Sequence, residues 1–224
     1  MNKELRKLDI FHGLKEETIE KLCEICNKRE LKKGEQLFYD KYKVNTIFIL
    51  LSGKAVLYKI SEKAQKKIIF LLGKGCMLND VILDDLPASI NCEIFEDAEV
   101  LSFPKESFIK IMEKDFELTR QVLNSLSKKV RRLYRQIKNS TPIKVEKRVA
   151  AKLWKLAKDY GVMKESGVEI NLDISITYLA DMFGTQRETI SRALKVLQGE
   201  GLVEIHRKRF VIKNLDNLAM FFKQ

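Results

Sequence analysis

The chain has 224 residues, of which 45% are hydrophobic and 33% charged, and its 42 Lys and Arg residues outnumber 31 Asp and Glu to give a net charge of +11. This composition is that of a globular protein and excludes disorder as its main state. No apolar run approaches the roughly 18 residues needed to span a bilayer, and the first residues lack the apolar stretch of a signal peptide. We therefore expect a cytoplasmic protein without a membrane partner, whose positive charge favours phosphate-rich partners.

The N-terminal part predicts a helix followed by many short strands. Residues 15–30 carry apolar and cysteine side chains at helical spacing, which predicts an amphipathic helix. Its buried face is expected to hold Ile19, Leu22, Cys23 and Cys26. Residues 31–103 contain short β-rich runs broken by turn residues, and this pattern favours an antiparallel β-roll or barrel over βαβ units.

Residues 105–138 predict one long helix. Along it an apolar position recurs at alternating spacings of three and four, the pattern of a coiled-coil seam. This apolar stripe consists of Phe116, Thr119, Leu123, Leu126, Val130, Leu133 and Ile137. Packing against the roll is the alternative use of this face, but a helix this long extends beyond a small roll. We therefore expect a homodimer with paired helices.

The segment from Asn139 to Pro142 is the best linker candidate, because proline lacks an N–H group and disfavours helical angles in the preceding residue. The predicted fold class is α+β in three parts. Residues 1–104 form a β-roll domain with an N-terminal helix, residues 105–139 a dimerisation helix and hinge, and residues 140–224 a winged helix-turn-helix domain. In the last part we expect a helix ending near Tyr160, one strand near residues 168–172, two short helices, two wing strands and a closing helix.

The helix-turn-helix prediction depends on residues 175–198, SITYLADMFGTQRETISRALKVLQ. Ala180 is small where the first helix must pass close to the second, Gly184 permits the turn, and Ile190 anchors the second helix. The second helix of such a motif enters the major groove with its N-terminal residues towards the base edges. The candidate DNA-binding residues on it are Thr185, Gln186, Arg187, Glu188, Ser191 and Arg192.

Three of these side chains have the donors or acceptors needed to contact bases. Arg187 and Arg192 can each donate two hydrogen bonds to guanine, and Glu188 can accept one from cytosine. A capping box formed by Thr185 and Glu188 is the alternative role of that glutamate. Further contacts, with phosphates, are expected from two basic regions. These are Lys208 and Arg209 at the tip of the wing, and the basic patch between Lys128 and Arg148.

No GxxxxGK[ST], HExxH or GxSxG motif occurs, so we do not expect an enzyme.

The chain resembles the CRP/FNR family of bacterial transcription regulators over nearly its whole length. The segments KKGEQLFYD, LLSGKAVLYKI, AEVLSFPKESF and TQRETISRALKVLQGEGLVE fall in the order and spacing of that family. The resemblance implies a cyclic-nucleotide-binding-like, cupin-like β-roll, a dimerising helix and a winged helix. It also implies an unknown small-molecule effector, contact with RNA polymerase, and double-stranded DNA with a TGA-containing inverted repeat as the target of Arg187, Glu188, Ser191 and Arg192.

The expected effector pocket departs from the pattern of family members that bind cyclic nucleotides. Those members have a Gly-Glu pair and an Arg-Ser pair for the ribose and phosphate. The corresponding residues here are Asn79, Asp80, Ala88 and Ser89, while Leu133 and Tyr134 replace the hydroxyl residues that meet the base. Because burying a phosphate without a cation is costly, we expect an effector other than cyclic AMP.

The cysteines and histidines leave a second interpretation open. Four scattered cysteines do not form a disulfide scaffold, and Cys23 and Cys26 on a buried helix face favour core packing over an iron–sulfur cluster. We expect no cofactor and no metal. The alternative is a redox-, metal- or haem-sensing regulator that uses Cys23 and Cys26, or His12 as a single haem ligand.

Overall fold

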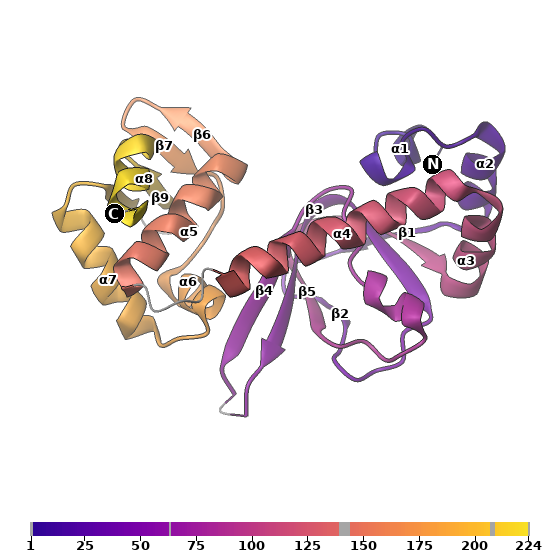
Figure 1. Cartoon of the computed structure of the whole chain (residues 1–224), viewed down its shortest axis with the longest axis horizontal. Coiled ribbons are helices and arrows are strands. Elements are labelled where there is room, and N and C mark those ends of the chain that lie inside the picture. Colours follow the sequence, from indigo (N-terminus) through magenta and orange to yellow (C-terminus); the bar gives the residue numbers. More distant parts are fainter. Residues whose placement is uncertain (1, 63, 139–143, 207–208, 224) are drawn as a thin grey trace. The chain divides into compact units, whose positions relative to one another are not determined.

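The structure is a computed structural model, which describes residues 2–62, 64–138, 144–206 and 209–223 (Figure 1). The chain divides into two compact units, the first comprising Met1–Lys59 with Ile68–Gln136 and the second Ile60–Lys67 with Ile137–Gln224. Within the described ranges, no helix combines the length and apolar character that crossing a membrane requires. The linker predicted between Asn139 and Pro142 lies outside the described residues.

A five-stranded β-roll forms the centre of the first unit. Its strands are β1 (Asn27–Leu31), β2 (Gln36–Phe38), β3 (Thr46–Ile60), β4 (Lys66–Leu72) and β5 (Asn91–Pro104). They follow the order β1-β5-β3-β4, and β2 also pairs with β5. Every pairing made by β5 is antiparallel, so the predicted antiparallel β-roll is confirmed.

Three short helical segments precede the roll: α1 (Asn2–Leu5), the 3-10 helix η1 (Asp9–Phe11) and α2 (Glu16–Ile25). The prediction of a helix reaching residue 30 is wrong, because Cys26 already has extended backbone angles and β1 begins at the next residue. Cys23 and Cys26 are therefore half-buried at the edge of the core, whereas Ile19 and Leu22 are fully buried.

The prediction of one helix over residues 105–138 is also wrong. The structure has α3 (Lys105–Lys114) and α4 (Phe116–Lys138), and Asp115 between them has φ −125° and ψ 101°. The Asp115 carboxylate accepts hydrogen bonds from the N–H groups of Glu117 at 2.9 Å and Leu118 at 3.3 Å. It therefore caps a new helix at the point where the preceding helix ends.

The apolar stripe lies on the exposed face of α4. Phe116 is 75% exposed, Leu123 54% and Ile137 68%, whereas Leu118 and Val122 on the neighbouring face are buried. Packing against the roll of the same chain thus uses a different face of α4 and leaves the stripe uncovered.

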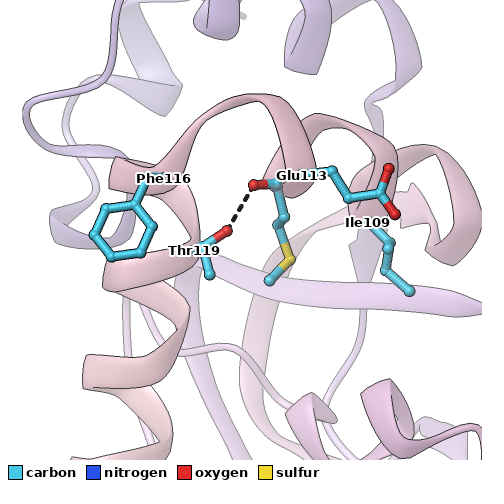
Figure 2. A pocket seen from close by; sticks show the side chains of 5 residues that line it. Ile109, Glu113, Phe116 and Thr119 are labelled. Carbon is cyan, nitrogen blue, oxygen red and sulfur yellow. Dashed lines mark hydrogen bonds between the residues drawn. The ribbon is translucent and has the colours of Figure 1, made fainter.

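An open pocket of about 360 Å³ extends the stripe to the junction of α3 and α4 (Figure 2). Its lining residues are Ile109, Met112, Glu113, Phe116 and Thr119, the last two of which belong to the stripe. The Thr119 hydroxyl donates a hydrogen bond to the backbone oxygen of Met112 at 2.7 Å, which fixes the first turn of α4 to α3. The stripe and the pocket therefore form one apolar surface.

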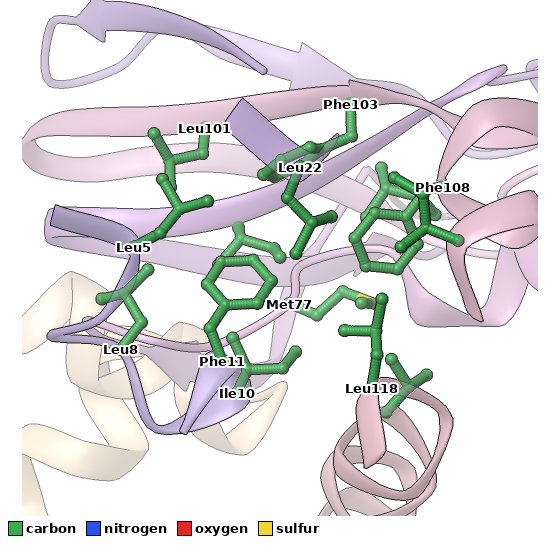
Figure 3. Packing of buried hydrophobic residues seen from close by; sticks show 14 of the residues in the cluster. Leu5, Leu8, Ile10, Phe11, Leu22, Met77, Leu101, Phe103, Phe108 and Leu118 are labelled. Carbon is green, nitrogen blue, oxygen red and sulfur yellow. The ribbon is translucent and has the colours of Figure 1, made fainter. Parts of the chain in front are cut away.

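Two hydrophobic clusters flank the long strand β3. Ile47 and Ile49 point into a cluster that contains residues of α2, α3 and α4 (Figure 3). Phe48 and Leu50 point into a second cluster, formed mainly by strands β1 to β5. Successive side chains of β3 therefore point to opposite faces, and both faces of the strand are buried. A bulge at Gly53, where φ is +75° and a Cβ would lie 2.2 Å from a backbone oxygen, keeps β3 paired with β5.

A winged helix-turn-helix makes up most of the second unit. Its helices are α5 (Val145–Tyr160), α6 (Ile176–Phe183), α7 (Arg187–Gly199) and α8 (Leu215–Lys223). Its antiparallel sheet has the order β6-β7-β9-β8, from β6 (Gly161–Lys164), β7 (Gly167–Ile170), β8 (Val203–His206) and β9 (Arg209–Ile212). The sequence predicts only one strand before α6, near residues 168–172, so β6, which follows α5 directly, was not predicted.

Candidate DNA-binding surface and effector region

The turn between α6 and α7 is fixed by local backbone contacts. Ser175 caps α6 by accepting a hydrogen bond from the N–H of Tyr178 at 3.0 Å. Gly184 ends α6 in the left-handed conformation, with φ of 60°, and the Thr185 N–H donates to the Ala180 oxygen at 3.2 Å. A glycine in this conformation is the usual end of a helix. The roles predicted for Ala180 and Gly184 agree with this geometry.

α7 presents different side chains on its two faces. Its buried face consists of Ile190, Ala193, Leu194 and Leu197. At the opposite face Gln186, Arg187, Glu188 and Arg192 are exposed, and Thr185 and Ser191 are half-buried. The buried face fixes the backbone of α7 and therefore the positions from which these polar side chains extend.

The capping box considered for Thr185 and Glu188 is not formed. The residue that caps α7 is Gln186, and no side chain makes the capping hydrogen bond. Within the described part of the chain, no hydrogen bond or ion pair joins the side chain of Arg187, Glu188 or Arg192 to another residue. Two guanidinium groups and one carboxylate at the start of α7 are thus free to meet an external partner.

In the wing, the contacts differ from one basic residue to the next. Arg209 donates to Asn171 Oδ1 at 2.7 Å and lies 3.0 Å from Asp173 Oδ1, so its charge is already balanced within the chain. Lys208, the other basic residue expected at the tip, lies outside the described residues. Glu204 on β8 binds Lys213, and this hydrogen bond is the main reason why the pKa of the Glu204 carboxyl is lowered.

In the roll, Asn79 serves the structure of the sheet. Its Oδ1 accepts a hydrogen bond from the N–H of Phe48 at 2.9 Å, and its Nδ2 donates to the oxygen of Thr46 at 2.7 Å. The next backbone contact along this edge of β3 is the Leu78 N–H, which donates to the Phe48 oxygen at 2.8 Å. The Asn79 amide thus continues the ladder of backbone bonds, and its polar atoms are already occupied.

Asp80 is the first residue of the 3-10 helix η2 (Asp80–Asp84), and its side chain is only 2% exposed. Its carboxylate binds Lys129 of α4, with Nζ 2.8 Å from Oδ1. Lys129 was not identified from the sequence as part of this region. Its position in the sequence could have identified it, because Lys129 lies seven residues after Val122 and therefore on the same, buried face of the helix.

The remaining pocket candidates do not all meet. Ala88 is buried in the cluster formed by the strands, and its backbone bonds to Lys41 and Tyr42. Ser89 is exposed, as are Leu133 and Tyr134 on α4. Asn79 and Asp80 are therefore engaged inside the roll, whereas three of the other four candidates lie on the surface.

Cys23 in α2 and Cys26 just after it are poorly suited to redox or metal chemistry. Burial raises the pKa of the Cys26 thiol to about 11, and it raises the pKa of the Cys23 thiol as well. Among the described residues, no group of three or more His, Cys, Asp or Glu side chains could hold a metal ion. His12 is exposed, and its backbone oxygen accepts a hydrogen bond from Gln121.

Two family descriptions match the chain. Residues 28–115 match the cyclic nucleotide-binding domain, and residues 147–221 match the Crp-like helix-turn-helix domain. A CRP-like cAMP-activated global transcriptional regulator of Mycobacterium tuberculosis is 21% identical, with 98% of each chain covered. An anaerobic regulatory protein of Haemophilus influenzae is 25% identical over 96% of this chain and 84% of its own.

Solved structures share the fold. The c-di-GMP responsive global regulator CLP of Xanthomonas campestris has a TM-score of 0.80 and 19% identity, and the match covers 89% of this chain and 100% of that one. A CRP/FNR family regulator of Thermus thermophilus has a TM-score of 0.76 and 20% identity, with 88% and 99% covered. The roll, the long helix and the winged helix-turn-helix occur in the order of both domain matches, and the chain belongs to the CRP/FNR family of transcription regulators.

Proposed function

We propose that the chain binds double-stranded DNA sequence-specifically, as a homodimer, at a TGA-containing inverted repeat, and regulates transcription through contact with RNA polymerase. The observation that carries this proposal is the exposed array of Arg187, Glu188 and Arg192 at the start of α7, without partners among the described residues. These side chains match the donors and acceptors of guanine and cytosine in the major groove. The proposed DNA contacts are Thr185, Gln186, Arg187, Glu188, Ser191, Arg192, Lys208 and Arg209. Of these, Arg209 would reach a phosphate by exchanging its ion pair with Asp173.

The uncovered stripe of α4 supports the homodimer. Leu123, Val130 and Ile137 are exposed at the spacing of a coiled-coil seam, and a second copy offers the same surface for burial. A dimer with twofold symmetry also explains an inverted repeat, because two copies of α7 then meet two half-sites whose centres lie about one helical turn apart. We assign dimerisation to residues 105–139 and DNA binding to residues 140–224.

The roll, residues 1–104, is proposed to sense a small molecule other than cyclic AMP. The hydrogen-bonding groups of Asn79 are occupied by β3, and Ala88 offers no cation for a phosphate. A buried phosphate without a positively charged partner is strongly disfavoured. The raised pKa of the Cys26 thiol argues against the redox alternative, because only the thiolate reacts or binds a metal.

Selection of bound duplexes from a random DNA pool tests the proposal, with and without cell extract as a source of effector. We expect enrichment of an inverted repeat with TGA in each half-site by the full chain, and a change in affinity when extract is added. The double variant Arg187→Ala with Arg192→Ala is the matched control and should enrich no motif. Enrichment of the same motif by that variant would contradict readout by α7.

A further inference from the structure

One charged side chain of α4 is buried in the roll. The Lys129 side chain is 12% exposed, and its Nζ donates to the backbone oxygen of Met77 at 2.7 Å and to Asp80 Oδ1 at 2.8 Å. Among the described residues Lys129 is the only partner of the Asp80 carboxylate, whose two oxygens both lie 2.8 Å from Nζ. Each of the two charged groups therefore has the other as its compensating charge.

The segment that receives Lys129 is held firmly on its other sides. Asn79 ties it to β3 through the two hydrogen bonds of its amide. Lys105 at the start of α3, only 7% exposed, donates to the oxygen of Ile82 at 3.2 Å and forms an ion pair with Asp85. η2 is thus a fixed anchor, and Lys129 attaches α4 to it.

This attachment is the main one in the second half of α4. After Val122, no apolar residue in the described part of α4 is buried. Arg132 and Gln136 also reach the roll: the Arg132 guanidinium lies 5.2 Å from the ring centre of Phe70, and Gln136 donates to the oxygen of Ile69 at 3.0 Å. Both of these side chains are exposed. Separating a buried ion pair leaves two uncompensated charges and is much more costly than breaking an exposed interaction.

We propose that Lys129 is a built-in ligand of the roll, which holds the second half of α4 against η2 in the absence of the effector and thereby sets the basal DNA affinity of the dimer. The inference rests on the proposed function, because Leu126, Val130 and Leu133 of the dimer stripe lie in the held segment. When the segment is held, the two stripes meet in a fixed register, and we expect such a dimer to bind both half-sites of an inverted repeat more tightly. When Lys129 is replaced, the segment has no buried attachment and the seam weakens.

Comparing Lys129→Met with Lys128→Met tests the proposal. Lys128 is the adjacent, exposed residue, and its substitution removes the same charge. Hydrogen exchange is measured over residues 124–137, together with affinity for the selected duplex and for a scrambled duplex. Lys129→Met should lose protection over residues 124–137, keep it around Leu118, and bind the selected duplex about tenfold or more weakly, a coupling of the usual size between two sites. Lys128→Met should keep wild-type protection and change affinity for both duplexes by the same factor.

A second variant separates this result from misfolding. Asp80→Asn with Lys129→Met removes both charges, leaves no buried unpaired ion, and should fold while still losing protection over residues 124–137. Wild-type protection and affinity in both variants would overturn the proposal. If the wild-type chain prefers no duplex, the proposed function fails, whereas hydrogen exchange still decides whether Lys129 holds α4.

Discussion

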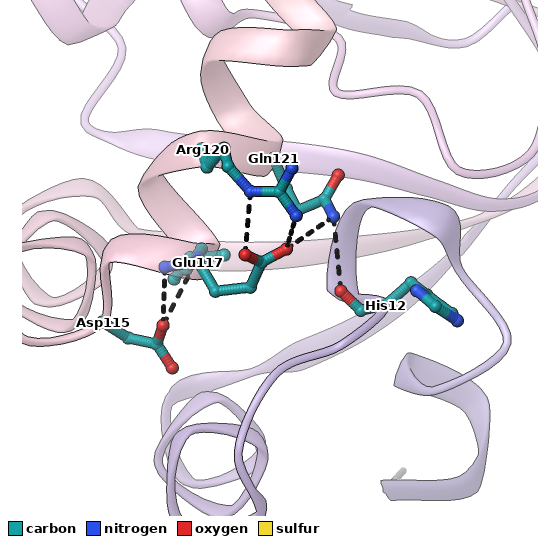
Figure 4. A network of polar contacts seen from close by, with 6 residues as sticks. His12, Asp115, Glu117, Arg120 and Gln121 are labelled. Carbon is teal, nitrogen blue, oxygen red and sulfur yellow. Dashed lines mark hydrogen bonds and ion pairs between the residues drawn. The ribbon is translucent and has the colours of Figure 1, made fainter.

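The hydroxyl of Thr18 in α2 donates a hydrogen bond to the carboxylate of Asp115, at the break between α3 and α4. The same carboxylate accepts the N–H groups of Glu117 and Leu118, as Figure 4 shows for the start of α4. Glu117 in turn binds Arg120 and Gln121, and Gln121 reaches the backbone oxygen of His12. The direction of α4 is therefore set by residues of the N-terminal segment.

Asp115→Ala should destabilise the roll by about 1 kcal/mol, the usual cost of losing a helix cap, and by more if Thr18 is left without a partner. Urea unfolding at neutral pH measures the change. Glu113→Ala, at the exposed end of α3, is the control and should change little. Equal effects of the two substitutions would show that the cap does not hold α4.

The same cap gives a pH dependence. Burial disfavours the charged form of Asp115, but hydrogen bonds from Thr18, Leu118 and Glu117 outweigh it and hold the pKa of this carboxyl below its ordinary value. A lowered folded-state pKa stabilises the fold above the unfolded-state pKa of about 3.9 and loses that contribution as the pH falls below it. The stability difference between wild type and Asp115→Asn should therefore shrink below about pH 4. A stability difference between the two proteins that stays constant down to about pH 3 would contradict the assignment of the lowered pKa to Asp115.

Leu126→Glu together with Leu133→Glu should yield monomers in sedimentation, because two charges per chain would be buried in the seam. The winged helix should remain folded, as monitored by the fluorescence of the single tryptophan, Trp154. Asn124→Glu together with Arg131→Glu, on an exposed face outside the stripe, is the control and should stay dimeric. A dimeric Leu126/Leu133 variant would show that the stripe is not the interface.

Calorimetry should detect no binding of cyclic AMP at physiological concentrations, because Ala88 supplies no cation and the Asn79 amide is bonded to β3. A nucleotide-binding member of the family, titrated under the same conditions, is the positive control. A micromolar dissociation constant with one nucleotide per subunit would mean that another basic residue reaches the pocket.

Alkylation by iodoacetamide at neutral pH should be slow at Cys26 and Cys92, whose pKa values burial raises to about 11 and about 12. Only the thiolate reacts, and at pH 7 a thiol of pKa 11 is ionised in about one molecule in ten thousand. Raising the pH should speed the reaction, and unfolding should restore ordinary rates. Alkylation of native Cys26 as fast as in the unfolded chain would revive the redox interpretation.

Local patterns in the sequence were sufficient to predict the roll, the stripe and the helix-turn-helix. Ala180, Gly184 and Ile190 have roles that depend on neighbours a few residues away, and Leu123 and Val130 follow a simple helical period. The wing strands were expected for the same reason, from two short apolar runs around a basic tip. The identity of the exposed residues at the start of α7 followed from that motif.

Features that depend on distant partners were not predicted. The break at Asp115 needs Thr18, which lies in another helix. The role of Lys129 needs Asp80 and η2, because a lysine in a basic helix resembles any solvated charge until its partner is known. Arg209 looked free in the sequence, yet Asp173 balances its charge. Each of these interactions joins residues whose proximity only the folded chain creates.

Readout of DNA by α7 is tested most directly by a salt titration of Arg187→Ala on the selected duplex and on a scrambled duplex. We predict a loss of about 1–3 kcal/mol on the selected duplex, relaxed preference at one position in each half-site, and nearly unchanged binding to the scrambled duplex. Lys208→Ala, which removes an expected interaction with a phosphate, should weaken both duplexes alike. It should also flatten the slope of log K against log salt by about one unit for each phosphate that is no longer neutralised. If Arg187→Ala weakens both duplexes equally, α7 does not read the sequence and the assignment of the recognition helix is wrong.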